Sequence, residues 1–330
     1  MTLTRRRLIT LAAATVAGSA TLLAAPAFAQ AWPSRTVTIV VSFPTGGDTD
    51  ALARVFAEKL AARIGQPVVV ENRTGASGTI GNAHVTRAAP DGHTLLFTPN
   101  TVVTAPLVLK AGAGPSYDVV NDFTPIIQMG SQSLFVVVNA ATGITDMAGL
   151  LAAIKSGKVT NYASPGTGSP MHILGELFNK AAGVKLTQVP YRGSGPAITD
   201  LVAGHIPMMY TTLGPVAQYI ANGRLRNLAV ADAQRSPLAP DVPTLAQAGV
   251  RDAELGAWQG FLAPKGLSPD IVRTLNGHFN EILKMPDVRE RMLQLALVPV
   301  GGEPGVMRDR IAVDQPRYAQ IIKEFGIQIE

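Results

Sequence analysis

The sequence predicts an α/β protein with two lobes, and three observations lead to this prediction. From residue 36 onward, short β-branched or apolar runs alternate with amphipathic runs, as in parallel sheets covered by helices. The same alternation begins again after about residue 131. Residues 123–138 and 255–263 are apolar stretches that can cross between two lobes. We therefore expect a discontinuous first lobe around an inserted second lobe, with residues 31–131 and 254–330 in the first and 132–253 in the second.

The first half of the chain carries strand signals around one clear helix. Residues 36–41 are β-branched, and residues 67–70 and 94–98 are short apolar runs typical of buried strands. Residues 50–64 hold an apolar side chain at every fourth position, which predicts an amphipathic helix. Gly65 follows, where such a helix is expected to end.

The second half repeats the pattern with helix starts that are easier to recognise. Ser169-Pro170 supplies the N-cap and the first residue of a helix that is expected to end before Gly183. Gly195-Pro196 opens another helix. Strands are expected at three apolar runs, residues 134–138, 208–210 and 225–230.

The C-terminal part of the chain predicts two helices. Ser268-Pro269 starts the first, whose apolar side chains recur on one face. Residues 304–325 form the second, in which Pro316 is expected to cause a kink or a break.

The first 29 residues have the pattern of an export signal. Arginines at positions 5–7 precede an uncharged, Ala-rich stretch, and Ala27-Phe28-Ala29 fits a signal-peptidase site. Residues 4–8 also resemble a twin-arginine signal. A membrane anchor is the alternative, although the stretch is short and ends in a cleavage-like site. We expect a mature periplasmic protein.

Charge and cysteine content exclude several classes of function. The full sequence has 28 Lys and Arg, of which three lie in the signal, so the mature chain has 25 basic residues against 23 Asp and Glu. Its net charge is therefore only about +2, which does not indicate a nucleic-acid partner. The absence of cysteine excludes disulfides, thiol catalysis and Cys-based metal sites. His172 and Glu176 lack the H-E-x-x-H pattern of a zinc site. We expect no metal, no cofactor and no catalytic residue.

The segment SFPTGGDTD at residues 42–50 joins a predicted strand to a predicted helix. Gly46 and Gly47 permit backbone conformations that other residues resist, and Asp48 or Thr49 can cap the helix. The free amide groups of such a turn suit an anion. An ordinary tight turn is the alternative, and a P-loop is excluded because no Gly-Lys-Ser/Thr follows.

Two further glycine-rich turns follow predicted strands. Residues 71–81 carry three glycines in a G-x-x-G-x-x-G spacing, which is weak evidence for a nucleotide. Residues 163–170 lead into a helix that Ser169 is expected to cap, and Ser169 lies outside any nucleophile elbow. His172 falls in the first turn of that helix, where it can meet a ligand or pack against the protein.

A fourth turn, residues 190–196, brings an aromatic ring and a cation together. Arg192 can form a bidentate pair with a carboxylate, or it can lie on the surface beside a packed Tyr191. Trp258 can line a cleft or fill the core. Ligands of open α/β sheets bind at the carboxyl ends of strands, where all four turns are expected. The sequence therefore predicts a ligand cleft between two lobes that close over a solute.

A series of short segments runs through nearly the whole predicted mature chain. They are residues 32–35 (WPSR), 41–47 (VSFPTGG), 70–73 (VENR), 75–78 (GASG), 88–92 (AAPDG), 162–164 (YAS), 175–178 (GELF), 189–193 (VPYRG), 241–244 (DVPT) and 262–264 (LAP). Together they resemble the Bug-type extracytoplasmic solute receptors, the substrate-binding proteins of tripartite tricarboxylate transporters. The resemblance implies a type II periplasmic binding protein, α/β in class, with two lobes joined by crossover strands.

The same resemblance implies a small ligand that carries a carboxylate: a di- or tricarboxylate, an amino acid, or an aromatic acid or amide. It also implies membrane subunits of a transporter as partners, and we expect a monomer. The candidate ligand-binding residues are Phe43, Thr45, Gly46, Gly47, Asp48, Asp50, Ala76, Ser77, Gly78, Thr79, Thr98, Asn100, Gly166, Thr167, Gly168, Ser169, His172, Tyr191, Arg192, Gly193 and Thr211.

Some positions depart from the pattern of that family. Thr45 replaces the second proline of the first turn, and Asp48 stands where a small residue is usual. An ionised Asp48 repels a carboxylate unless it points away or pairs with a cation. We hypothesise that Asp48 favours a ligand with a positive or amide group. The segment at residues 210–212 also differs, which leaves the ligand open.

Two other functions are alternatives to a transport receptor. A secreted α/β hydrolase or transferase would need a nucleophile with a placed base, and neither Ser169 nor any histidine has that context. A receptor that passes its signal to a sensor protein is the other alternative, and the sequence does not distinguish it from transport.

Overall fold

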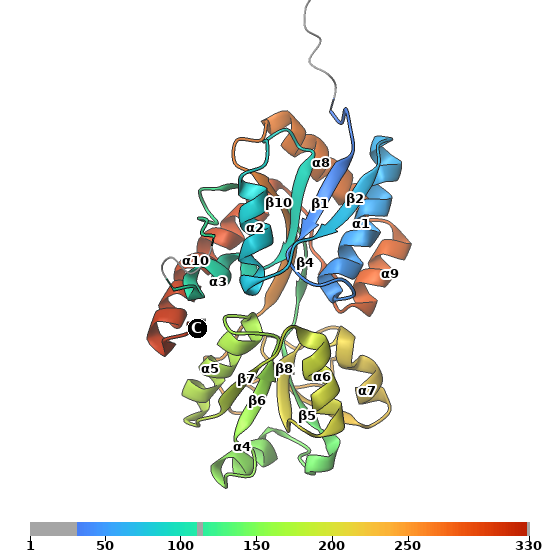
Figure 1. Cartoon of the computed structure of the whole chain (residues 1–330). Helices are drawn as coiled ribbons and strands as arrows, with labels where there is room; N and C mark the ends of the chain where they lie inside the picture. Colours follow the sequence, from blue (N-terminus) through green and yellow to red (C-terminus); the bar gives the residue numbers. More distant parts are fainter. Residues whose placement is uncertain (1–31, 111–114, 329–330) are drawn as a thin grey trace, which may run out of the picture.

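The structure is a computed structural model that describes residues 32–110 and 115–328. Two α/β lobes lie end to end, each with one sheet and flanking helices (Figure 1). We call the part with the six-stranded sheet lobe 1 and the part with the five-stranded sheet lobe 2. The predicted α/β class with two lobes is confirmed. The predicted export signal, residues 1–29, lies outside the described residues.

The sheet of lobe 1 has the strand order β11-β4-β10-β3-β1-β2. β1 pairs in parallel with β2 and β3, whereas β10 runs antiparallel between β3 and β4. The strands are β1 (Val37–Val41), β2 (Val68–Asn72), β3 (Thr94–Pro99), β4 (Phe123–Gln132), β10 (Ala257–Pro264) and β11 (Val298–Pro299).

The helices of lobe 1 surround this sheet (Figure 1). α1 begins at Asp48, two residues before the predicted start, and ends at Gly65 in the left-handed conformation. Pro316 lies inside α10, a single helix from Pro304 to Phe325. The helices are α1 (Asp48–Ile64), η1 (Ala76–Gly78), α2 (Thr79–Thr86), α3 (Thr101–Val108), α8 (Pro269–Ile282), α9 (Pro286–Gln294) and α10 (Pro304–Phe325).

The sheet of lobe 2 has the order β7-β6-β8-β5-β9. Its strands are β5 (Phe135–Asn139), β6 (Asn161–Ser164), β7 (Thr187–Pro190), β8 (Met208–Thr211) and β9 (Leu225–Val230). Ser169 caps α5 as predicted, because its hydroxyl accepts from the His172 amide at 3.2 Å. The helices are η2 (Ala140–Thr142), α4 (Met147–Lys155), α5 (Pro170–Ala182), α6 (Ser194–Ala203), η3 (Gly214–Val216) and α7 (Ala217–Ala221).

The chain passes between the two sheets at residues 133–134 and again between β9 and β10. Backbone hydrogen bonds tie the two passages together: the Ala231 amide donates to Leu134 at 2.8 Å, and the Leu255 amide donates to Ala231 at 2.8 Å. These paired segments form the hinge region. The exact lobe boundaries, 131/132 and 253/254, stay a prediction.

Each lobe holds an apolar interior that fixes its sheet. In lobe 1, Phe261 on β10 stacks on Phe279 of α8 with ring centroids 4.1 Å apart. Trp258 is fully buried and donates its indole N–H to Asp314 of α10 at 2.7 Å, which links the crossover strand to that helix. In the described part of the chain, no helix is both long enough and apolar enough to cross a membrane.

Candidate ligand-binding cleft

A cavity of about 420 Å³ lies between the two lobes. Its lobe 1 wall comes from the turns that follow β1, β2 and β3, and its lobe 2 wall from the turns that follow β6, β7 and β8. The candidate residues on this wall are Phe43, Thr45, Gly46, Gly47, Asp48, Ser77, Asn100, Gly166, Thr167, Gly168, Ser169, Arg192 and Gly193. The structure thus brings together the glycine-rich turns of both halves.

The other candidates lie outside the cavity wall, and the side chains of three of them, Asp50, His172 and Tyr191, are engaged elsewhere. Asp50 forms an ion pair with Arg54 at 2.9 Å. Burial raises the pKa of Asp50, but its hydrogen bonds outweigh burial and hold this pKa below its usual value. His172 accepts from the Gly168 amide through Nδ1 at 3.1 Å, and the Tyr191 hydroxyl donates to Asp200 at 2.7 Å. The remaining candidates off the wall are Ala76, Gly78, Thr79, Thr98 and Thr211, of which Gly78, Thr79, Thr98 and Thr211 are buried.

The sequence analysis missed several polar residues of the cavity. Thr101 follows β3, and Thr212 follows β8, so the rule that ligands bind at the carboxyl ends of strands could have found both. Gln132 and Gln259 lie on the crossover strands and are almost completely buried. Their signal was a polar side chain within an apolar crossover segment.

Two hydrogen bonds join the lobes across the cavity. The Thr212 hydroxyl lies 3.5 Å from Asp48 Oδ2, and the Ser77 hydroxyl donates to the Thr167 carbonyl at 3.4 Å. Gly168 also approaches lobe 1 closely, because a Cβ at this position would lie 2.8 Å from the side chain of Val108. The structure is therefore a form in which the lobes touch.

The cavity wall carries two charged side chains from opposite lobes, Asp48 and Arg192. Burial raises the pKa of Asp48 to about 6, although the hydrogen bond from Thr212 opposes this shift. Arg192 is exposed and makes no ion pair with any residue between 32–110 or 115–328. Arg192 is thus a cation available to an anion in the cleft.

The starts of four helices also face the cavity: α1 and α3 from lobe 1, and α5 and α6 from lobe 2. α6 begins beside Arg192 after Gly193, and no side chain caps its first amides. α1 likewise lacks a side-chain cap, but its first residue is Asp48, whose own negative charge lies at the positive end of the helix. α3 of lobe 1 also starts at the cavity without a side-chain cap, but α6 is the helix whose uncapped start lies beside a cation. No group of three or more metal-ligating side chains occurs among the residues that the structure describes.

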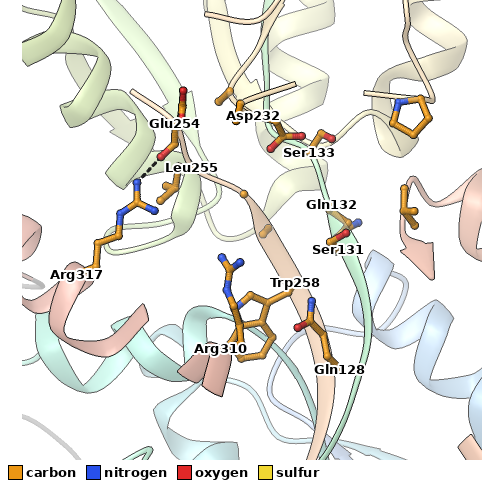
Figure 2. A pocket seen from close by; sticks show the side chains of 16 residues that line it. Gln128, Ser131, Gln132, Ser133, Asp232, Glu254, Leu255, Trp258, Arg310 and Arg317 are labelled. Atoms are coloured by element: carbon orange, nitrogen blue, oxygen red, sulfur yellow. Dashed lines mark hydrogen bonds between the residues drawn. The ribbon is translucent and has the colours of Figure 1, made fainter. Parts of the chain in front are cut away.

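A second cavity of about 450 Å³ lies at the hinge, and we call it the hinge cavity. Gln132 and Ala257 line both cavities, so the crossover strands form a common wall. Figure 2 shows Arg310 and Arg317 reaching into it from α10. None of the residues predicted for the ligand lines this cavity.

Comparison with known proteins agrees with this geometry. Residues 52–327 match the family model described as the tripartite tricarboxylate transporter family receptor. The chain is 36% identical to protein BugT of Bordetella pertussis over 312 aligned residues. These residues cover 93% of this chain and 94% of BugT.

Solved structures give the same result. The periplasmic binding protein BugD superposes with a TM-score of 0.81 at 32% identity, over 91% of this chain and all of that one. MatC of Rhodopseudomonas palustris, solved with bound malate, superposes with a TM-score of 0.79 at 31% identity. The superposed part covers 88% of this chain and 99% of the MatC chain. An R. palustris protein solved with adipate superposes with a TM-score of 0.83 at 32% identity. The superposed part covers 90% of this chain and 99% of the adipate-bound one.

The match extends over most of the chain, and the Bug-type resemblance seen in the sequence is confirmed. The chain therefore belongs to the family of tripartite tricarboxylate transporter receptors.

Proposed function

We propose that the protein is a periplasmic receptor that captures a small carboxylate-bearing metabolite and delivers it to the membrane subunits of a tripartite transporter. The observation that carries this proposal is the exposed Arg192, which has no ion pair in the described residues and lines the cavity between the lobes beside the uncapped start of α6. A guanidinium and free backbone amides are the groups that bind carboxylates most strongly.

Relatives with known ligands support this class of ligand. Adipate and malate, which are found in two similar structures, are small dicarboxylates. A cavity of about 420 Å³ suits a molecule of this size. The candidate residues on the cavity wall are accordingly proposed as ligand contacts.

Capture is proposed to work by a shift between open and closed lobes. The contacts Asp48–Thr212 and Ser77–Thr167 exist only when the lobes meet, and a ligand that touches both walls adds to them. Such a ligand binds the closed form better and so increases its population. The membrane subunits would then recognise the closed form.

A thermal-shift screen of carboxylates, amino acids and amides tests ligand capture. A ligand that binds only the folded protein raises its melting temperature, and recovery of the intact ligand afterwards shows that no reaction occurs. Failure of every compound to shift the melting temperature would contradict the proposal.

Delivery needs a separate test with the membrane subunits. Proteoliposomes that contain the two membrane subunits should take up the labelled ligand only when the receptor is present outside. Uptake that is the same with and without the receptor would contradict delivery, and would leave a sensory role as the explanation of binding.

A further inference from the structure

Two glycines of lobe 2 approach lobe 1 more closely than a residue with a side chain could. A Cβ at Gly214 would lie 2.8 Å from the backbone carbonyl carbon of Leu295. A Cβ at Gly168 would lie 2.8 Å from both methyl groups of Val108. Real Cβ atoms essentially never come within 3.0 Å of another heavy atom. A side chain at either glycine would therefore force the lobes, or the residues that they touch, to move.

The two contacts lie on opposite sides of the molecule. Gly214 begins η3, which runs directly into α7, and Leu295 is the C-cap of α9. Gly168 comes just before α5, and Val108 is the last residue of α3. Figure 1 shows α7 and α9 along one side of the two lobes and α3 and α5 along the other. The lobes therefore touch on both flanks of the molecule.

The backbone of Leu295 is held in place within lobe 1. Its amide donates to the Arg291 carbonyl at 3.2 Å, and its carbonyl accepts from Gln132 Nε2 at 3.1 Å. The next residue, Ala296, has a φ of 54°, which is uncommon for a residue with a side chain. Because Leu295 is fixed on both sides, a side chain at Gly214 would push the lobes apart rather than displace Leu295.

Gly214 is required by its contact and not by its backbone conformation. Its φ lies outside the left-handed region, so alanine fits the local backbone. Gly168, in contrast, has a φ of 76° and lines the cavity, so a substitution there would also change the turn and the cavity wall. Gly214 lies outside the cavity lining. Its contact with Leu295 can thus be altered without altering a group that faces the ligand.

From this geometry we infer that Gly214 controls lobe closure: its missing side chain lets lobe 2 reach Leu295, and a side chain there would hold the lobes apart and lower ligand affinity. The inference rests on the proposed function and adds to it a residue that acts without touching the ligand. A ligand reaches both walls only in the closed form. Binding therefore weakens in proportion to the closed population that is lost.

Disulfide trapping on the opposite flank measures closure without any ligand. The chain contains no cysteine, so Val108→Cys and Gly168→Cys add its only two thiols. A Cβ at Gly168 would lie 3.2 Å from the Cβ of Val108, near the spacing of about 3.8 Å that a disulfide spans. The rate at which oxidised glutathione links the two thiols therefore reports how often the lobes close.

Gly214→Ala in this two-cysteine protein should slow the crosslink at least about fivefold, because an overpacked contact is costly. Gly214→Val should slow it further. Without the cysteines, Gly214→Ala should weaken binding by a similar factor in isothermal titration with adipate, or with the best compound of the thermal-shift screen if adipate does not bind. Gly277→Ala on α8 is the matched control and should change neither quantity, because a Cβ there would meet no described atom within 4 Å.

The outcomes separate this inference from the proposed function. An unchanged crosslinking rate in Gly214→Ala overturns the inference and leaves the proposed function standing. A parent pair that never crosslinks also overturns it, as does a Gly214→Ala variant that fails to fold, because the contact then belongs to the fold and not to closure. If the crosslink slows as expected but no compound of the screen binds, the closure contact stands and the proposed function fails.

Discussion

The cleft between the lobes and the hinge cavity have nearly the same size, about 420 and 450 Å³, but differ in what their walls leave unpaired. In the hinge cavity, Arg310 pairs with Asp314 at 2.9 Å, and Arg317 donates to the Glu254 carbonyl at 2.6 Å (Figure 2). In the cleft, Arg192 has no ion-pair partner in the described structure. The cations of the two walls therefore differ: both hinge arginines have partners, whereas Arg192 has a bonding capacity left for a ligand.

The two cavities also differ in the elements that build them. The cleft is lined by turns at strand ends and by the starts of α1, α5 and α6, which supply backbone groups. The hinge cavity is lined by the two crossover segments and by side chains from the middle of α10. The first arrangement places backbone groups of both lobes around one space, whereas the second is built around the segments that connect the lobes.

The largest effect that separates the two cavities is expected from Arg192→Ala. Hydrogen bonds to a charged group contribute about 1.5–3 kcal/mol, so the affinity for a carboxylate should fall roughly 10- to 100-fold. Titration with a ligand from the thermal-shift screen measures this loss. The control Arg317→Ala removes a hinge cation and should change affinity by less than about twofold; equal losses would contradict the contrast.

The next largest effect is expected from Asp48→Asn, which should change the stability of the protein in a way that depends on pH. The pKa of Asp48 is raised from 3.8 to about 6 in the folded protein, so the ionised group costs stability as pH rises between these values. Asp48→Asn removes this cost but also a favourable charge at a helix start. The variant should match the natural protein near pH 4 and exceed its stability by roughly 1–2 kcal/mol near pH 7.

Urea unfolding across this pH range measures the difference. Asp309→Asn, which removes an exposed charge, should show no such pH dependence. A stability gain of Asp48→Asn that stays constant from acid to neutral pH would mean that the carboxylate is not desolvated in the cleft.

A smaller effect is expected from Ser77→Ala, which removes a contact across the cleft. The hydrogen bond to Thr167 is neutral and long at 3.4 Å, so its loss should weaken ligand binding only about two- to threefold. The matched control is Ser156→Ala, whose hydroxyl bonds within lobe 2 on the surface. An identical affinity in both variants would show that this contact does not support closure.

The smallest effect is expected at the hinge, from Asp232→Asn. Burial raises the pKa of Asp232, and the nearby Glu254 adds to the shift, while a hydrogen bond from Ser133 opposes it. The substitution removes a partly buried carboxylate whose charged form burial disfavours, so the melting temperature should rise by at most about 2 °C. Ligand affinity should be unchanged; a tenfold loss would make the hinge cavity part of the binding site.

Much of the fold could be predicted because its signals are local. The apolar spacing of residues 50–64 and the N-caps Ser169 and Ser268 correspond to α1, α5 and α8. α3 was missed, because its sequence TVVTAPLV is β-branched and contains Pro106. There, packing against the rest of lobe 1 overrides the preference of the segment.

The candidate site was predicted less completely than the fold. The glycine turns were found because glycine and helix-start patterns are visible in the sequence. The partners that take Asp50, His172 and Tyr191 away from the cavity could not be identified from spacing alone. Gln132 and Gln259 were missed because their role depends on a bond between residues 127 positions apart.

The sequence by itself determined the α/β class, the turns that precede helices, and the presence of a cation and an unusual Asp48 in two of these turns. Only the tertiary structure decided which of these groups share one cavity and which are engaged elsewhere. The physical reason is range: periodicity and capping act within a few residues, whereas Asn100 is oriented by Tyr318, 218 positions away. The set of groups that share the cleft therefore arises from the assembled lobes.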